Sequence, residues 1–260
     1  MTALCETFRR QAFWTWDQLG RARRINAHLG EESLTDFNLL EIRSRHSQEV
    51  ITKTFTKAEE GVIGADWEWW LTGRSLQWVG FRLQAKVINH VSERFEHLHY
   101  TTQAGRHQSE MLCERSRTNG CIPLYCLYTH WSPASLRTPW RCGSYAATPE
   151  SYGCSLVDGF YVDRVRADPN SRRLDSLIEH MTPWHCLVCC AAAGGEDLAS
   201  RALNFWRAGI FDADAPGVSG ISFAPLPEPP FYIRQLLQNE LVEPPDPFVR
   251  TVTVLREGGS

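Results

Sequence analysis

The sequence ADWEWWL at residues 65–71 and the run QWVGFRLQAKVI at residues 77–88 decide the fold prediction. Both segments are rich in aromatic and β-branched residues, which favour strands. The sequence TGRS at residues 72–75 lies between them and is typical of a hairpin loop. We therefore predict two antiparallel strands that are neighbours in a sheet.

Alternation along these strands gathers polar side chains on one face. Asp66 and Glu68 share a face of the first strand, while Gln84 and Lys86 share a face of the second. Carboxylate and amide oxygens suit a hard cation such as Mg²⁺, and a nearby lysine can neutralise charge on a phosphoryl group. The alternative is the exposed face of a half-buried hairpin, on which an acidic residue and the lysine form an ordinary ion pair.

The segments around the hairpin predict further helices and strands. Apolar periodicity indicates an amphipathic helix over residues 3–28 and a second helix capped by Ser33, and a β-branched run predicts a strand over residues 50–56. After the hairpin we expect a helix over residues 103–117 and a buried strand over residues 122–128. The predicted fold class is α/β, with a mixed central sheet flanked by helices in the order helix, three strands, helix, strand.

The second half of the chain has weaker patterns. Residues 131–260 are predicted to form a C-terminal elaboration packed on the core, which spans residues 1–130 with the N-terminal helix. A buried strand is expected over residues 185–190 and a short helix over residues 231–240.

The run HCLVCC at residues 185–190 also carries zinc-like spacing. His185 precedes a C-x-x-C pair formed by Cys186 and Cys189. A second C-x-x-C is missing and the neighbours are apolar, so we interpret these cysteines as buried thiols in a strand.

Charge and cysteine content bound the function classes. A net charge of −3 and a pI of about 6.3 do not favour passive coating of nucleic acid, but they leave a nuclease open because a cleft can be locally positive. The nine cysteines are irregularly spaced, and we recognise neither a signal peptide nor an apolar run of the ~20 residues that span a bilayer. The expectation is a reducing cytoplasm, free thiols and no membrane association.

Asp66 followed by Gln84-x-Lys86 on the next strand, within this order of elements, resembles the PD-(D/E)xK nuclease superfamily. The Mrr-like restriction endonucleases are the most similar branch, because glutamine often replaces the acidic residue of their E-x-K pair. Residues 59–70 also look like an uncharacterised bacterial family associated with defence against phage or plasmids. The resemblance covers residues 34–130 and implies a restriction-endonuclease-like core.

By this resemblance Asp66 is the metal ligand, Gln84 is a weaker oxygen ligand, and Lys86 positions water or stabilises charge. The neutral glutamine removes a negative charge from the metal site, so a further carboxylate is expected.

Three acidic residues are candidates for this carboxylate. Many relatives supply a glutamate from the helix before the first strand, and Glu41 stands there in this sequence. Glu60 precedes Asp66 closely, and Glu68 lies on the same strand face as Asp66.

The implied activity is phosphodiester hydrolysis in nucleic acid, with Mg²⁺ or Mn²⁺ as cofactor, DNA as the expected substrate and anti-phage defence as the expected setting. An inactive nuclease-like module that binds or senses nucleic acid is the alternative, because Gln84 is neutral. A structural partner in a defence complex is a third hypothesis, and a homo-oligomer stays open.

Overall fold

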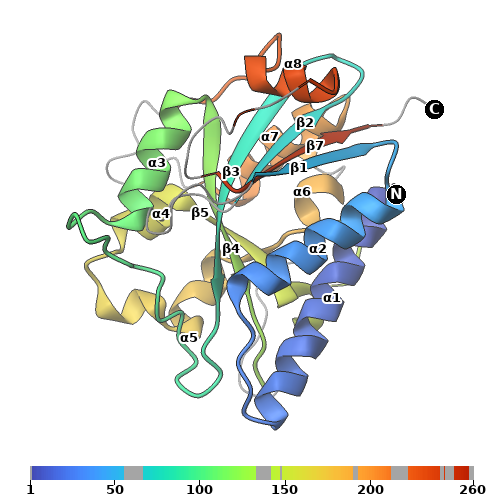
Figure 1. Cartoon of the computed structure of the whole chain (residues 1–260). Helices are drawn as coiled ribbons and strands as arrows, with labels where there is room; N and C mark the ends of the chain where they lie inside the picture. The colour runs from blue at the N-terminus through green and yellow to red at the C-terminus, as the bar shows by residue number, and fades with distance from the viewer. Residues whose placement is uncertain are drawn as a thin grey trace.

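The structure is a computed structural model that describes residues 2–55, 67–132, 142–146, 148–189, 193–211, 222–240, 243 and 249–257. The described strands form one mixed sheet with helices on both faces, so the mixed α/β class is confirmed (Figure 1). The strands are β1 (Val50–Thr54), β2 (Trp67–Thr72), β3 (Trp78–Val87), β4 (Cys121–Tyr128), β5 (Cys154–Asp158), β6 (Thr182–Pro183) and β7 (Thr251–Arg256). The helices are α1 (Ala3–Arg24), α2 (Glu31–Arg45), α3 (Gln108–Thr118), α4 (Gly159–Arg164), α5 (Leu174–Leu177), α6 (Cys186–Cys189), α7 (Leu198–Gly209) and α8 (Phe231–Leu237), with 3₁₀ turns η1 (Pro149–Gly153), η2 (Pro169–Arg172) and η3 (Ile178–His180).

The sheet order is β1-β7-β2-β3-β4-β5-β6. β2 and β3 pair antiparallel, as predicted, and β3 pairs parallel with β4. The C-terminal strand β7 lies between β1 and β2, parallel to β2 and antiparallel to β1. Residues 131–260 therefore supply three strands of the same sheet, one of them within the N-terminal half.

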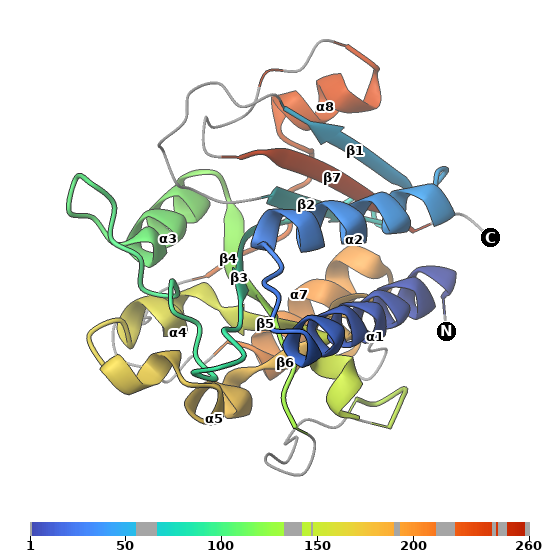
Figure 2. The same cartoon turned by 60° about the horizontal axis from the view of Figure 1, so that its bottom comes forward.

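Two apolar layers cover the sheet. The odd-numbered residues of β3, such as Phe81 and Leu83, pack with α1, α2, α6 and α7 on one face. Trp70, Tyr125 and Leu127 pack with α3, α5 and α8 on the other face. Figure 2 shows α2 and α8 on opposite sides of β1, β7 and β2. Both faces of the central strands are thus shielded from water.

The boundary between the first two helices differs from the prediction. α1 ends at Arg24, and Asn26 follows with a left-handed φ of 52°. Gly30 is the N-cap residue of α2, so Ser33 lies inside the first turn and is not the cap. Glu31 and Glu32 therefore occupy the first turn of α2, where negative charge is favourable at the positive end of the helix dipole.

The prediction of a strand over residues 185–190 is wrong, because residues 186–189 form the short helix α6. A short apolar run fits either a strand or a buried helical turn, so periodicity alone does not separate them. The sequence patterns also missed β5, α7 and β7, whereas the helix near residue 231 is confirmed as α8. In the described part of the chain, no helix combines the length and apolar character that a bilayer crossing requires.

Gly153 ends η1 directly against α1. A Cβ atom at this position would lie 1.9 Å from the carbonyl oxygen of Ala12 and 2.7 Å from the backbone nitrogen of Trp16. Backbone atoms cannot move aside as a flexible side chain can, so the close approach requires glycine.

We expect Gly153→Ala to lower the free energy of unfolding by about 3 kcal/mol or more, the upper end of the cost of overpacking. Urea unfolding of wild type and variant measures this loss. Gly30→Ala is the matched control, because an added Cβ there meets nothing within 4 Å, and its expected cost is below about 1 kcal/mol. Equal losses in the two variants would contradict the proposed packing.

Candidate functional site

Lys86 lies near the end of β3 and is only 5% exposed. Its Nζ is 3.7 Å from Oε2 of Glu31, the first residue of α2. The other Glu31 oxygen accepts a hydrogen bond of 3.2 Å from the backbone N–H of Val87. The Glu31 side chain is 26% exposed, so this carboxylate–ammonium pair has access to solvent from one side.

Glu31 is a site residue that the sequence patterns missed. It precedes Ser33, the predicted cap, and therefore fell outside the expected helix. The signal that would have found it is the pair of glutamates directly after Gly30, since acidic residues are typical of a first helical turn.

Glu41 does not lie beside Lys86. It pairs with Arg45 one turn further along α2, on the outer side of the helix. Ten residues of helix separate Glu41 from Glu31, which is about 15 Å along the axis. Of Glu31 and Glu41, it is Glu31 that lies at the end of β3.

Gln84 shares the face of Lys86, as strand alternation predicted, and it is 2% exposed. Its amide nitrogen lies 3.5 Å from the carbonyl oxygen of Ala85. The alternative of an exposed hairpin face is wrong, because β2 is buried along its whole length and β3 is buried up to Lys86.

Asp66 and Glu60 lie outside the described residues. The first described residue of β2 is Trp67, whose partner on β3 is Leu83. Leu83 directly precedes Gln84 in the sequence, and Trp67 directly follows Asp66. The described register therefore ends one residue short of both predicted ligands.

Glu68 is surrounded by donors. It is fully buried opposite Arg82, whose Nε donates to Glu68 Oε1 at 2.8 Å. Glu68 Oε2 accepts from Trp70 Nε1 at 3.0 Å and from the Tyr232 hydroxyl at 2.6 Å. These contacts engage both oxygens, so the geometry gives Glu68 a structural role instead of the predicted role as a metal ligand.

Two other buried groups have perturbed pKa values. Burial raises the pKa of Asp158 to about 7, although its carboxylate caps α4 by accepting from Tyr161 N at 3.3 Å. Burial is also the main reason that the pKa of His99 is lowered to about 4, and its ring is 2.7 Å from the Ser171 hydroxyl. Both are enclosed in the packing and neither contacts the Lys86 pair.

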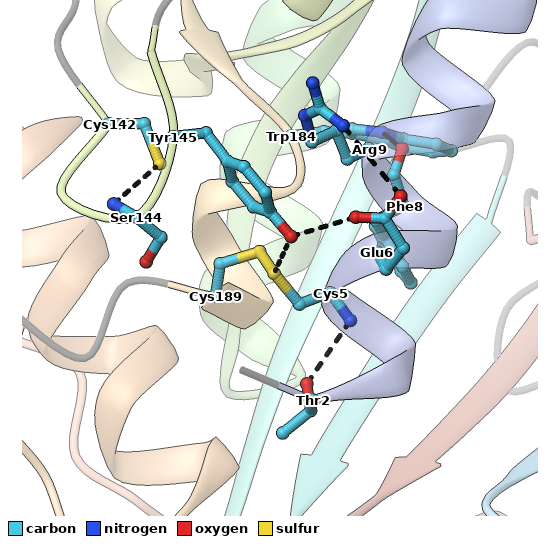
Figure 3. The surroundings of a disulfide bond; sticks show 10 residues. All are labelled: Thr2, Cys5, Glu6, Phe8, Arg9, Cys142, Ser144, Tyr145, Trp184 and Cys189. Atoms are coloured by element: carbon cyan, nitrogen blue, oxygen red, sulfur yellow. Dashed lines mark hydrogen bonds and ion pairs between the residues drawn. A yellow bond between two sulfur atoms is a disulfide. The ribbon is translucent and has the colours of Figure 1, made fainter.

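A disulfide joins Cys5 of α1 to Cys189 of α6. The prediction that all thiols are free is therefore wrong for this pair. Figure 3 shows the Tyr145 hydroxyl directed at the disulfide and at Glu6. The hydroxyl donates to Glu6 Oε2 at 2.9 Å and lies 3.8 Å from the Cys5 sulfur. The disulfide links the first helix covalently to the C-terminal half of the chain.

Replacing Arg82 tests the structural role of Glu68. We expect Arg82→Met to lower the free energy of unfolding by about 3–5 kcal/mol, because it leaves a buried carboxylate without its partner. Arg45→Met is the matched control, since its partner Glu41 is at the surface, and it should cost less than about 1 kcal/mol. Adding Glu68→Gln to Arg82→Met should recover part of the loss in urea unfolding. A double variant less stable than Arg82→Met alone would contradict this role.

The raised pKa of Asp158 predicts a pH dependence of stability. Between pH ~4 and pH ~7 the folded protein holds a proton at Asp158 that the unfolded chain has released, so stability falls as pH rises through this window. The slope is at most about 1.4 kcal/mol per pH unit. Asp158→Asn removes this contribution, so the stability of wild type relative to the variant should decrease with pH in urea titrations. Parallel pH profiles of stability for wild type and Asp158→Asn would contradict the raised pKa of Asp158.

Comparison with known proteins places the chain in a family. Residues 4–260 match the family described as "Family of unknown function (DUF6615)". No curated protein and no solved structure matches the chain. The family match extends from α1 to beyond β7, and so it includes every strand of the sheet together with Glu31, Gln84 and Lys86. The chain therefore belongs to the DUF6615 family.

Proposed function

We propose that this protein is a metal-dependent hydrolase of phosphodiester bonds in nucleic acid, with DNA as its substrate. The observation that carries the proposal is the buried Lys86, which pairs with the partly exposed carboxylate of Glu31 and shares a face of β3 with Gln84. A buried ammonium is costly unless a partner or a ligand compensates it. Glu31 compensates that charge, and its partly exposed carboxylate can bind a cation, which in turn can attract an anionic phosphate.

The arrangement of elements supports a restriction-endonuclease-like core. α2, β1, β2, β3, α3 and β4 follow one another in the expected order. The antiparallel β2–β3 pair and the parallel β3–β4 pair are compatible with that core. The insertion of β7 between β1 and β2 is a departure from a simple chain of neighbouring strands.

The donor set fits a hard cation. Glu31 offers a carboxylate, Gln84 offers an amide oxygen two residues before Lys86 on the same strand face, and the sequence places Asp66 directly before Trp67. We propose Glu31, in place of Glu41, as the carboxylate that offsets the neutral Gln84. Bound Mg²⁺ or Mn²⁺ would supply Lewis-acid stabilisation of the phosphate charge. Lys86 would hold the scissile phosphate and neutralise its developing charge.

A cleavage assay tests this proposal. The full chain is incubated with supercoiled plasmid, single-stranded DNA and RNA, each with Mg²⁺, with Mn²⁺ or with EDTA. We expect DNA cleavage that requires the metal and falls by at least about 100-fold in Lys86→Met and Asp66→Asn, the usual cost of losing a group that stabilises the transition state. Lys53→Met is the matched control, because Lys53 is an exposed lysine on β1.

The variants Glu31→Gln and Glu41→Gln test which of these two residues supplies the carboxylate. We expect the first variant to lose cleavage and the second to keep it, because Glu31 pairs with Lys86 whereas Glu41 pairs with Arg45. The opposite order would refute the assignment of Glu31. No cleavage of any nucleic acid by wild type, or full activity in Lys86→Met, would refute the hydrolase itself.

The neutral Gln84 favours a second candidate, a nuclease-like module that binds nucleic acid without cutting it. This candidate expects tight DNA binding with no metal-dependent cleavage. Calorimetric titration with Mn²⁺ distinguishes the two proposals, since the hydrolase requires metal binding that Asp66→Asn and Glu31→Gln weaken.

A further inference from the structure

Cys142, His185 and Cys186 lie close together in the structure, whereas of these three the sequence pattern indicated only His185 and Cys186 as potential ligands. Their sulfur and ring-nitrogen atoms all lie within 4.8 Å of one another. We propose that these three residues bind a zinc ion. This site is separate from the proposed phosphodiesterase site, because it uses none of the residues of β3 or α2.

Trp184, the residue before His185, fixes the position of His185 and Cys186. Its backbone N–H donates to the Cys154 carbonyl at 3.0 Å, and its indole N–H donates to the Phe8 carbonyl at 2.6 Å. Trp184 is fully buried, so the beginning of α6 is anchored to both β5 and α1. Two ligands therefore come from a rigid part of the core.

Cys142 comes from a different segment of the chain. Tyr145 lies three residues after it, with its ring 5.9 Å from that of His185 in an edge-on contact. The Tyr145 hydroxyl is held by Glu6, as Figure 3 shows. The Cys142 sulfur also accepts from the backbone N–H of Ser144 at 3.4 Å, a type of contact that stabilises a thiolate. Contacts to α1 thus position the third ligand.

The environment of the His185 ring is a second, independent observation that indicates a bound metal. It is 1% exposed, and within the described residues neither of its ring nitrogens has a hydrogen-bond partner. Buried imidazole nitrogens normally have partners, because an unsatisfied polar atom in the core is costly. A metal ion bound between His185 and the two sulfur atoms would satisfy one nitrogen.

The donor set selects the kind of metal. Two sulfurs and one imidazole suit zinc, whereas Mg²⁺ requires oxygen ligands. An ion at the centre of three atoms that are at most 4.8 Å apart would be at most about 2.8 Å from each, so the ligands need to close by no more than about 0.5–0.8 Å to reach zinc bond lengths. Both cysteines bind as thiolates, so binding releases two protons to solvent. Zinc prefers four ligands, so three protein ligands would leave the fourth to water or an external ligand; Cys142, which is half-buried, is the ligand nearest to solvent by its exposure.

Because of the disulfide, only one cysteine of the C-x-x-C pair is available to bind the metal. Cys189, the second cysteine of that pair, is bonded to Cys5. Cys142 takes its place as the second sulfur ligand. The proposed site therefore does not require reduction of the disulfide, and it binds metal in the oxidised protein.

Cobalt binding to the full chain tests the proposal. The metal-free protein is titrated with Co²⁺ without reductant, and the absorption spectrum is recorded before and after Zn²⁺ is added. We expect one equivalent of Co²⁺, with the intense visible bands of tetrahedral coordination, near-ultraviolet sulfur-to-cobalt charge transfer, and displacement by zinc. Absence of charge-transfer bands in wild type overturns the proposal.

Variants identify the ligands. Cys142→Ser and Cys186→Ser should each weaken metal binding by at least about 100-fold and reduce the charge-transfer intensity, since each removes one sulfur. Cys113→Ser, at a buried thiol of α3 outside the cluster, should bind as wild type does. The double variant Cys5→Ser, Cys189→Ser should also retain binding. Unchanged binding in Cys142→Ser and Cys186→Ser, or its loss in the double variant, overturns the assignment. Circular dichroism confirms that each variant is folded.

Discussion

Glu68 and Arg82 face each other across the two central strands with almost no access to water, and the surrounding structure has to satisfy both charges. Removing two charges from water costs several kcal/mol per ion, and the attraction between them offsets this only with good geometry and further hydrogen bonds. Trp70 and Tyr232 provide those bonds. Tyr232 belongs to α8, so the pair also requires the C-terminal half to close over the hairpin.

This requirement constrains the register of the hairpin. A slip of either strand by one residue would turn its charged side chain, Glu68 or Arg82, away from its partner and toward the apolar layer formed with α1 and α7. With the register set, Gln84 and Lys86 lie further along the same face of β3. The strand then ends beside the first turn of α2, where Glu31 meets Lys86 and the backbone of Val87.

The chain carries two groups of potential metal ligands with different chemistry. Among the described residues, the Glu31 carboxylate lies at the end of β3, and sulfur and imidazole donors lie together near the beginning of α6. Hard cations prefer the first kind of site and zinc prefers the second, so the two proposed sites do not compete for the same ion. The hydrogen bond from Trp184 to α1 holds the beginning of α6, and with it the second group, in place.

The hairpin, the order of elements over residues 34–130 and the shared face of Gln84 and Lys86 were determined by the sequence alone. These features depend on local periodicity, which alternation along a strand or the turn of a helix expresses directly. The choice between Glu31 and Glu41 was different, because it depends on where α2 begins and on which of its turns reaches β3. With Ser33 as the expected cap, Glu31 fell outside the predicted helix, so its pairing with Lys86 was not anticipated.

Only the tertiary structure decided the position of β7, the helical state of residues 186–189, the disulfide and the meeting of Cys142 with His185 and Cys186. Each joins segments far apart in the chain or depends on the packing around a short apolar run. No local pattern records such contacts, because their free energy comes from burial and pairing that exist only once the sheet has assembled.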